Sequence, residues 1–308
     1  MSDMKYLFGP VPSRRMGLSL GISPIPKKTC NYSCIYCQLG RTNRMTNTRQ
    51  EYFPLQDIID EFDAHIDASK DCDVITLVGE GEPTLYSRMG ELIDALHERT
   101  EIPIAVITNG ALMYDEQVRK ELMKADIVLP SLDACTEEMF KKIDRPIGTI
   151  KYDEVVDGLI TFSKEYQGKL YLEVMLLDGM NDTEEELQGF KELLGKMKYD
   201  RVYLNTAVRP PAEENVNACS KEKMAHAVEV LNGISIEMLA EGGFSSDIED
   251  DYEAILSIIG RHPMNQHEIK ILLDGRKHSN VDEMLKQLAE DPKVDCQEYK
   301  GYITYRLR

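Results

Sequence analysis

The chain has 308 residues, of which 42% are apolar and 29% charged, and its formal net charge is −18. This composition indicates a soluble globular protein with room for one large domain and one small domain. The acidic total argues against broad binding to nucleic-acid phosphates. The sequence has neither an apolar run of membrane-spanning length nor an N-terminal secretory signal, so we expect a cytoplasmic protein without a membrane partner.

Six short runs rich in β-branched and apolar residues predict strands, and helical patterns lie between them. These runs are 18–23, 74–79, 104–109, 127–133, 170–177 and 202–208. Helix starts are indicated by Pro54, which suits a first helical position, and by the capping-box spacing of Thr183 and Glu186. Strands that are apolar on both faces predict an α/β fold of parallel units, as a partial (βα)₆ barrel or a doubly wound sheet. Ligands of such folds bind at the carboxyl ends of the strands.

The last fifty residues follow a different pattern. Helices predicted after Asn265 and Asn280, followed by a hairpin that turns at 300–301, indicate a small winged-helix-like domain. An acidic stretch precedes them. We therefore expect a barrel domain at 1–245, and an acidic connector with a winged-helix-like domain at 246–308. We expect the second domain to pack on or near the barrel mouth and to help select a macromolecular or bulky substrate rather than to bind DNA. A purely stabilising lid is the alternative.

Three of the seven cysteines, Cys30, Cys34 and Cys37, lie directly after the first predicted strand, where residues 1–50 carry eight basic residues against one acid. Cytosolic thiols stay reduced, which favours a metal or catalytic site over disulfides. Three thiols with this spacing and no obvious fourth ligand suit three irons of a cubane Fe–S cluster, with the fourth iron open. Zinc with a distant fourth ligand and three buried thiols are the alternatives. The other four cysteines are scattered and are expected to act as small apolar side chains.

Two motifs carry a family resemblance. The run 30–37, CNYSCIYC, resembles the signature of the radical S-adenosylmethionine (SAM) superfamily, including the aromatic residue before the third cysteine. The run 79–86, GEGEPTLY, resembles the Gly-Glu-Pro motif of that superfamily and ends the second predicted strand. The opening FGPVPSRRMGLSLGISPIPKKTC resembles a subgroup of little-characterised Fe–S oxidoreductases related to wybutosine-synthesis enzymes. The resemblance covers residues 5–245.

The resemblance implies a radical SAM enzyme with one [4Fe–4S] cluster on the three cysteines and with SAM on the open iron. One electron, from a donor such as flavodoxin or ferredoxin, cleaves SAM to a 5′-deoxyadenosyl radical that abstracts hydrogen from a substrate. The match places Tyr36 against the adenine and the 81–83 segment at the SAM amino group. The expected cofactor-binding residues are Tyr36, Gly81, Glu82, Pro83, Asn109, Ser131, Asp133 and Asn181.

Several of these residues also suit purely structural roles. Glu82 suits a structural acid at a strand end, whereas Asn109 and Ser131 suit turn or cap positions. Asp133 suits either a substrate contact or a helix cap. Arg49, in the basic N-terminal segment, is expected on a solvated surface.

Three substrate classes stay open, namely a small molecule, a protein and tRNA. Arg14, Arg15 and Arg209 are candidate contacts for a substrate phosphate or carboxylate. The wybutosine-type relatives use a second cluster, and this sequence has no second cysteine triad, which disfavours the tRNA-modifying alternative. An Fe–S redox-sensing regulator with a DNA-reading winged helix is an alternative of another class. The acidic helix predicted at 281–290 disfavours DNA binding. A zinc-binding structural module is the third option.

Overall fold

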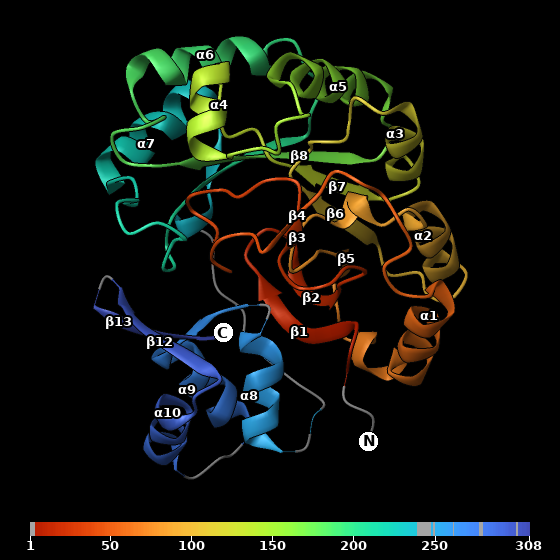
Figure 1. The fold of residues 1–308 in the computed structure, drawn as a ribbon, viewed down its shortest axis with the longest axis vertical. Coiled ribbons are helices and arrows are strands. Elements are labelled where there is room, and N and C mark those ends of the chain that lie inside the picture. The colour runs from red at the N-terminus through yellow and green to blue at the C-terminus, as the bar shows by residue number, and fades with distance from the viewer. Residues whose placement is uncertain (1–3, 239–247, 249, 261, 277–279, 300) are drawn as a thin grey trace.

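The computed structural model describes residues 4–238, 248, 250–260, 262–276, 280–299 and 301–308 (Figure 1). Its central element is an eight-stranded sheet with the order β1-β2-β5-β6-β7-β8-β9-β10. Only the edge pair, β1 and β2, is antiparallel in this sheet. The strands are β1 (Leu7–Ser13), β2 (Gly17–Ile22), β5 (Val74–Leu77), β6 (Ile104–Thr108), β7 (Ile127–Pro130), β8 (Lys169–Leu176), β9 (Arg201–Thr206) and β10 (Ile234–Ser235).

Helices connect these strands. They are α1 (Leu55–Ala64), α2 (Met89–His97), α3 (Glu116–Leu122), α4 (Glu137–Ile143), α5 (Tyr152–Glu165), α6 (Glu184–Leu194) and α7 (Lys221–Leu231). Short 3₁₀ turns lie at Ile66–Ser69, Pro83–Leu85 and Ile236–Met238, and a small parallel pair, β3 (Thr29–Cys30) and β4 (Arg44–Met45), lies in the cysteine loop. No helix in the described part of the chain is both long and apolar enough to cross a membrane.

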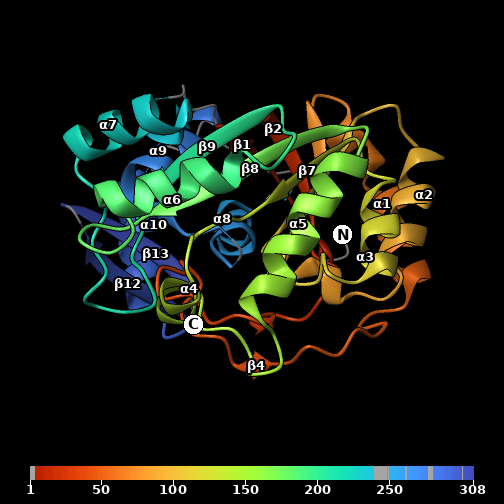
Figure 2. The same cartoon turned by 90° about the horizontal axis from the view of Figure 1, so that it is seen from above.

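Apart from α4, which packs through Phe140 on Tyr32 of the cysteine loop, these helices cover the outer face of the curved sheet (Figures 1 and 2). Alternate strand residues show this division, because successive strand side chains point to opposite faces. Ile75 and Leu172 pack with helix side chains in the largest core cluster. Their strand neighbours Val74 and Tyr171 belong to a separate cluster of mainly strand residues. One-sided helices and an open sheet match the partial barrel rather than the doubly wound arrangement.

The predicted α/β fold with a parallel sheet is confirmed, since the six predicted strands coincide with β2 and β5 to β9. The edge strand β1 was not predicted. It contains Gly9, Pro10 and Pro12, residues that weaken a strand pattern and that sheets tolerate at their edges. The prediction for Pro54 was wrong by one position, because this residue is the N-cap and α1 begins at Leu55.

Helix caps follow the predicted residues with one difference. The Thr183 side chain accepts a hydrogen bond from the Glu186 N–H, as the spacing predicts. The Glu186 carboxylate instead accepts a hydrogen bond from Cys135 Sγ, over 2.9 Å. Asn265 begins its helix with a reciprocal capping box, and Asn280 caps the next helix.

The C-terminal segment has a core of its own that includes part of β1. Its elements are α8 (Asp251–Ile259), β11 (Met264–Asn265), α9 (Gln266–Gly275), α10 (Val281–Glu290), β12 (Val294–Tyr299) and β13 (Tyr302–Leu307), with the antiparallel sheet order β11-β13-β12. Ile258, Leu272 and Leu288 pack there against Phe8 and Val11 of β1. The helices and the hairpin occur where the sequence predicts them. Lys300 of the predicted turn and residues 239–247, 249 and 261 lie outside the described residues, whereas 251–259 of the expected acidic connector form the helix α8.

Candidate functional site

A cavity of about 430 Å³ lies inside the open barrel. One part of its wall is formed by the loops that follow β2, β5, β6 and β7. A second part is formed by the inner faces of β1, β8 and β9. The C-terminal segment adds residues of α9 and His262 before it. Of the residues predicted from the sequence, the cavity wall includes Arg14, Arg15, Cys30, Cys34, Tyr36, Cys37, Gly81, Glu82, Asn109, Ser131 and Arg209. It does not include Pro83, Asp133 or Asn181, all of which the structure describes.

The three cysteines share this wall, and each has a different polar neighbour. Cys30 Sγ accepts hydrogen bonds from the Asn109 amide, over 3.7 Å, and from the Tyr32 N–H, over 3.4 Å. Cys34 Sγ donates to Asp144 Oδ1 over 3.6 Å. Among the described residues, no three His, Cys, Asp or Glu side chains are grouped closely enough to form a ready-made metal site. The sulfur atoms therefore face one cavity without converging on a point.

Burial decides the protonation of these thiols. It raises the pKa of Cys30, Cys34 and Cys37 above the ordinary thiol range. At Cys37 the cations Lys28 and Arg306 lower the pKa in opposition to burial. Thiols in such a setting stay neutral until a cation offsets the charge of the thiolate.

The loop after β5 passes directly against the cysteine loop at Gly81. A Cβ atom at this position would lie 1.8 Å from the Thr29 carbonyl oxygen, so a larger residue would displace the cysteine loop. Glycine is therefore required here by the close approach of two backbones. The contact places the Gly-Glu-Pro segment beside the residues that precede Cys30.

Glu82 organises the strand ends around it. Its carboxylate is 2% exposed and accepts hydrogen bonds from the Thr84 N–H and hydroxyl, the Thr108 hydroxyl and the Asn109 N–H, over 2.5–2.9 Å. Burial raises the pKa of Glu82, whereas these hydrogen bonds lower it. Glu82 thus joins the carboxyl ends of β5 and β6, in addition to lining the cavity.

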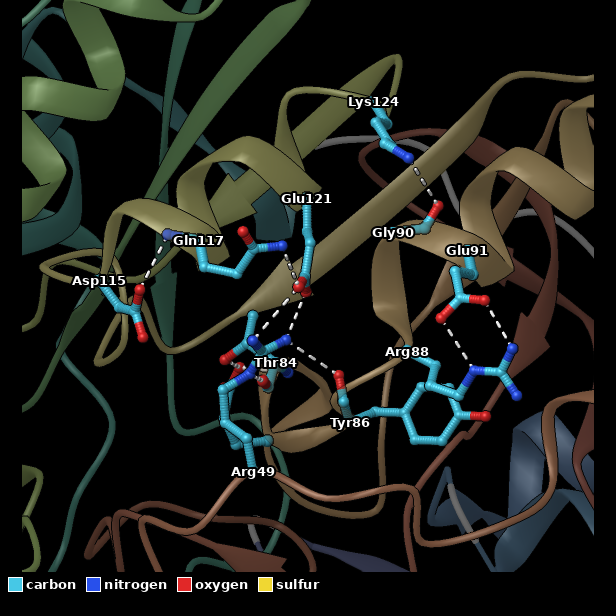
Figure 3. A network of polar contacts seen from close by, with 11 residues as sticks. Arg49, Thr84, Tyr86, Arg88, Gly90, Glu91, Asp115, Gln117, Glu121 and Lys124 are labelled. Atoms are coloured by element: carbon cyan, nitrogen blue, oxygen red, sulfur yellow. Dashed lines mark hydrogen bonds and ion pairs between the residues drawn. The ribbon is translucent and has the colours of Figure 1, made fainter.

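A second layer of polar contacts supports this loop from outside. Figure 3 shows Arg49 donating to the carbonyl oxygens of Thr84 and Tyr86, over 2.8 and 3.1 Å, and pairing with Glu121 of α3. The Gln117 amide donates to the same carboxylate over 3.0 Å. The expectation that Arg49 lies on a solvated surface was wrong, because the guanidinium is needed to satisfy buried carbonyl groups.

Asp133 and Asn181 lie behind the cavity wall. The Asp133 carboxylate accepts hydrogen bonds from the Tyr36 hydroxyl and from the Met175 N–H, and burial raises its pKa. It does not cap α4, whose N-cap is Thr136. Asn181 is fully buried, and its amide donates to the Asp133 and Met175 carbonyl oxygens. Both side chains position other residues, and Asp133 holds Tyr36 at the cavity.

Sequence reasoning missed two polar residues behind the cysteines. Asn31 is fully buried, and its side chain accepts from Asn109 and donates to Asn47, over 2.7 and 3.1 Å. Its place in the cysteine motif is the signal that could have identified it. Asp144, which faces Cys34, follows α4 and lies far from any motif, so no local signal marks it.

The C-terminal segment reaches the same cavity. Arg209, which follows β9, donates to Glu268 Oε1 over 3.0 Å, to the Pro263 carbonyl over 2.7 Å and to His262 Nε2 over 2.7 Å. Arg306 of β13 donates to the Gln38 carbonyl over 3.4 Å. These contacts tie the segment to the open side of the barrel and to the cysteine loop.

A parallel βα barrel with three thiols and a Gly-Glu-Pro loop at the carboxyl ends of its strands is the arrangement expected of radical SAM enzymes. The chain belongs to the radical SAM superfamily, a superfamily of enzymes, because residues 25–190, over half of the chain, match the model of that superfamily. The predicted superfamily is therefore confirmed.

Individual relatives refine this placement. The UPF0026 protein MJ1312 of Methanocaldococcus jannaschii is 35% identical over 98% of this chain and 96% of its own length. A protein of Brachyspira hyodysenteriae named GTPase Obg is 40% identical over 98% of this chain, which spans only 45% of that protein. A solved structure of TYW1 with a lysine-pyruvate adduct bound has a TM-score of 0.53 and 17% identity, over 73% of this chain and 75% of that chain. At the level of the fold, it agrees with the predicted relation to wybutosine-synthesis enzymes.

Proposed function

We propose that the protein holds one [4Fe–4S] cluster on Cys30, Cys34 and Cys37 and cleaves SAM reductively. The observation that carries this proposal is that all three thiols and the Gly81-Glu82 segment line one cavity at the strand ends. The donor set fits the cluster, since three soft sulfur ligands on one loop leave a fourth iron without a protein ligand. The amide of Asn109 and the N–H of Tyr32 donate to Cys30 Sγ, and hydrogen bonds of this kind orient and tune the sulfur ligands of a metal site.

When bound together, the cluster and SAM supply a 5′-deoxyadenosyl radical for hydrogen abstraction, after one electron from a donor such as flavodoxin or ferredoxin. The residues of this chain bind and orient. Tyr36, held by Asp133, is proposed to lie against the adenine, and Asn109 and Ser131 to contact the ribose. Gly81 and Glu82 are proposed to shape the amino-group site. Pro83 and Asn181 are proposed to act indirectly, by supporting the loops.

We also propose that residues 1–245 act as the barrel domain and 246–308 as its partner domain. The apolar core of α8 to β13, which is distinct from the main barrel core and takes in only Phe8 and Val11 of β1 and the nearby Val78 from the barrel, supports this division. The lining of the cavity by His262, Glu268 and Ile271 supports a role of the second domain in closing the site. Exclusion of water by such a cover protects a reactive intermediate.

The test is anaerobic reconstitution followed by chemical reduction in the presence of SAM. We expect about four irons and four sulfides per chain, and formation of 5′-deoxyadenosine and methionine. Alanine at any one of Cys30, Cys34 or Cys37 should abolish cleavage. Cys296→Ala, at an exposed thiol of β12, is the matched control and should retain it. About eight irons per chain, or iron retained after all three substitutions, would contradict the proposal.

A further inference from the structure

The inner face of the barrel is unusually polar on the side of β1, β8 and β9. The interior of a closed βα barrel is normally filled by branched apolar side chains. Here the cavity wall includes polar side chains from five strands and one turn, namely Ser13, Arg15, Ser19, Thr76, Glu173 and Asn205. Burying such a layer is unfavourable unless its groups find partners. The layer therefore needs either internal hydrogen bonds or a polar ligand.

Arg15 is the best-supported member of this layer. It comes from the turn between β1 and β2, and its guanidinium pairs with Glu173 through one nitrogen, Nη1. The Asn205 amide donates to the same carboxylate over 3.0 Å, and the Tyr203 hydroxyl donates to the Arg15 carbonyl over 3.3 Å. Both ends of the residue are thus held. A guanidinium has five N–H donors, so a single nitrogen on Glu173 leaves donors for the cavity that Arg15 lines.

Two further arginines, Arg14 and Arg209, line the same region. Burial lowers the pKa of Arg14 and of Arg15, that of Arg15 to about 10, and the charge of Arg209 lowers both further. The nearby carboxylates are Glu173, Glu268 and the exposed Glu237. Arg15 and Arg209 are each paired with one of these carboxylates, and an oxyanion would accept from the guanidinium donors of Arg15 that Glu173 leaves unused.

The hydroxyl of Ser13 supplies an independent observation. Ser13 Oγ is buried and has no hydrogen-bond partner among the described residues, yet Ser13 lines the cavity beside the arginines. Buried polar atoms without partners are rare in folded proteins, and a bound ligand is one way to satisfy them. Because Ser13 directly precedes Arg14 and Arg15 and lines the same cavity, its hydroxyl is suited to donate to an oxyanion bound there.

We propose that Ser13, Arg14, Arg15 and Arg209 form an arginine subsite that binds the oxyanion, a carboxylate or phosphate group, of a small substrate. The proposal rests on the proposed function, because the subsite shares its cavity with the cysteines and Gly81. A volume of about 430 Å³ is in the range of small-molecule sites, roughly 300–1,000 Å³. Arg15 and Ser13 contact the anion, and the C-terminal segment completes the subsite by holding Arg209 through Glu268.

The experiment measures the Tm of the reconstituted, SAM-bound protein at increasing concentrations of inorganic phosphate and, separately, of acetate. A sodium chloride series at the same ionic strength gives the baseline. Bound SAM keeps the probes out of its own carboxylate site. We expect one of the two anions to raise Tm saturably above the chloride baseline, which identifies the group on the substrate. Arg15→Gln should weaken the apparent affinity at least about tenfold, because it removes charge-assisted hydrogen bonds.

Two further variants keep the test decisive. Ser13→Ala removes only the hydroxyl and leaves the Arg15–Glu173 pair, so it should weaken anion binding roughly threefold or more without lowering Tm in chloride. Arg88→Gln, which removes the surface pair with Glu91 (Figure 3), is the control and should bind the anion as the wild type does. A Tm that rises equally in chloride, or wild-type anion affinity in both Ser13→Ala and Arg15→Gln, would overturn the subsite.

The proposed function is measured separately in the same wild-type preparation. Formation of 5′-deoxyadenosine without any anion effect would overturn the subsite alone. An anion effect that Arg15→Gln removes, in protein that forms no 5′-deoxyadenosine, would support the subsite and count against the radical chemistry.

Discussion

The cavity has two walls that are built in different ways. The thiol wall, made by Cys30, Cys34, Cys37, Gly81 and Glu82, comes from loops that directly follow β2 and β5. The arginine subsite combines the β1–β2 turn with the end of β9, and Arg209 within it is held by residues of the C-terminal segment. The first wall is held mainly by hydrogen bonds that backbone and side-chain donors of the loop after β5 and the end of β6 make to the Glu82 carboxylate. The second is held by ion pairs between distant segments.

This difference separates chemistry from recognition. A loop that ends a parallel strand is held largely by the neighbouring strands, which suits groups that must hold a cofactor. The arginine subsite is assembled from the β1–β2 turn, the end of β9 and the C-terminal segment, so a sequence change in any one of these segments can alter its shape and charge. We therefore expect the thiol wall to determine whether SAM is cleaved, and the arginine subsite to determine which substrate is used.

The largest effect is expected at Glu82. Glu82→Ala leaves four hydrogen-bond donors of Thr84, Thr108 and Asn109 without an acceptor, which should lower the free energy of unfolding by about 3–5 kcal/mol. Urea unfolding under anaerobic conditions measures this loss. The exposed Glu91→Ala is the control, with an expected change within about 0.5–1 kcal/mol. A loss below about 1 kcal/mol at Glu82 would show that the thiol wall does not depend on this carboxylate.

An intermediate loss of unfolding free energy is expected at the Arg209–Glu268 ion pair, which holds the C-terminal segment to the barrel. Arg209→Ala and Glu268→Ala should each cost about 2–3 kcal/mol, because the remaining partner stays partly buried without its counter-charge. The double variant should cost clearly less than the sum, and a double-mutant cycle measures this coupling. The exposed pair Glu137 and Lys141 gives the comparison, with about 0.3–0.5 kcal/mol expected. If the losses of unfolding free energy at Arg209 and Glu268 were strictly additive, the ion pair would not hold the C-terminal segment to the barrel.

The smallest effect is a pH dependence at His262. Burial and then the charges of Arg209, Arg15 and Arg14 hold the pKa of His262 well below its ordinary value of 6.5. The unfolded chain therefore binds a proton that the folded protein does not, and stability should fall as the pH drops below 6.5. The slope is at most about 1.4 kcal/mol per pH unit, the value for one proton. His262→Gln should lack this slope in parallel denaturation curves, and equal slopes in the two proteins would refute the assignment.

Much of the thiol wall could be predicted from the sequence. Cys30, Cys34, Cys37 and the Gly81-Glu82 segment occur in short motifs, and each motif follows a strand whose apolar pattern is evident. Parallel strands bring their carboxyl ends together, so position along the chain was enough to place these residues in one cavity. Asp133 shows where this logic ends, because a residue after β7 was predicted at the cavity and instead supports Tyr36 from behind.

The arginine subsite could be anticipated only in part. Arg14, Arg15 and Arg209 were recognised as charged residues near strand ends, but Glu173, His262 and Glu268 were not. Glu173 lies within an apolar strand pattern, and nothing nearby in the sequence indicates that its side chain meets Arg15. The edge strand β1, which supplies Ser13, was hidden by Pro10 and Pro12.

The sequence by itself determined the order of β2 and β5 to β9 with helical segments between them, the superfamily, and the loop that carries the thiols. These properties depend on apolar periodicity and on short motifs, which are local along the chain. Only the tertiary structure decided that Glu82 joins β5 to β6, that Arg49 is partly buried against Glu121, and that residues within 262–271 complete the cavity. These outcomes depend on which distant polar groups are buried together and must satisfy one another, and no single segment of sequence carries that information.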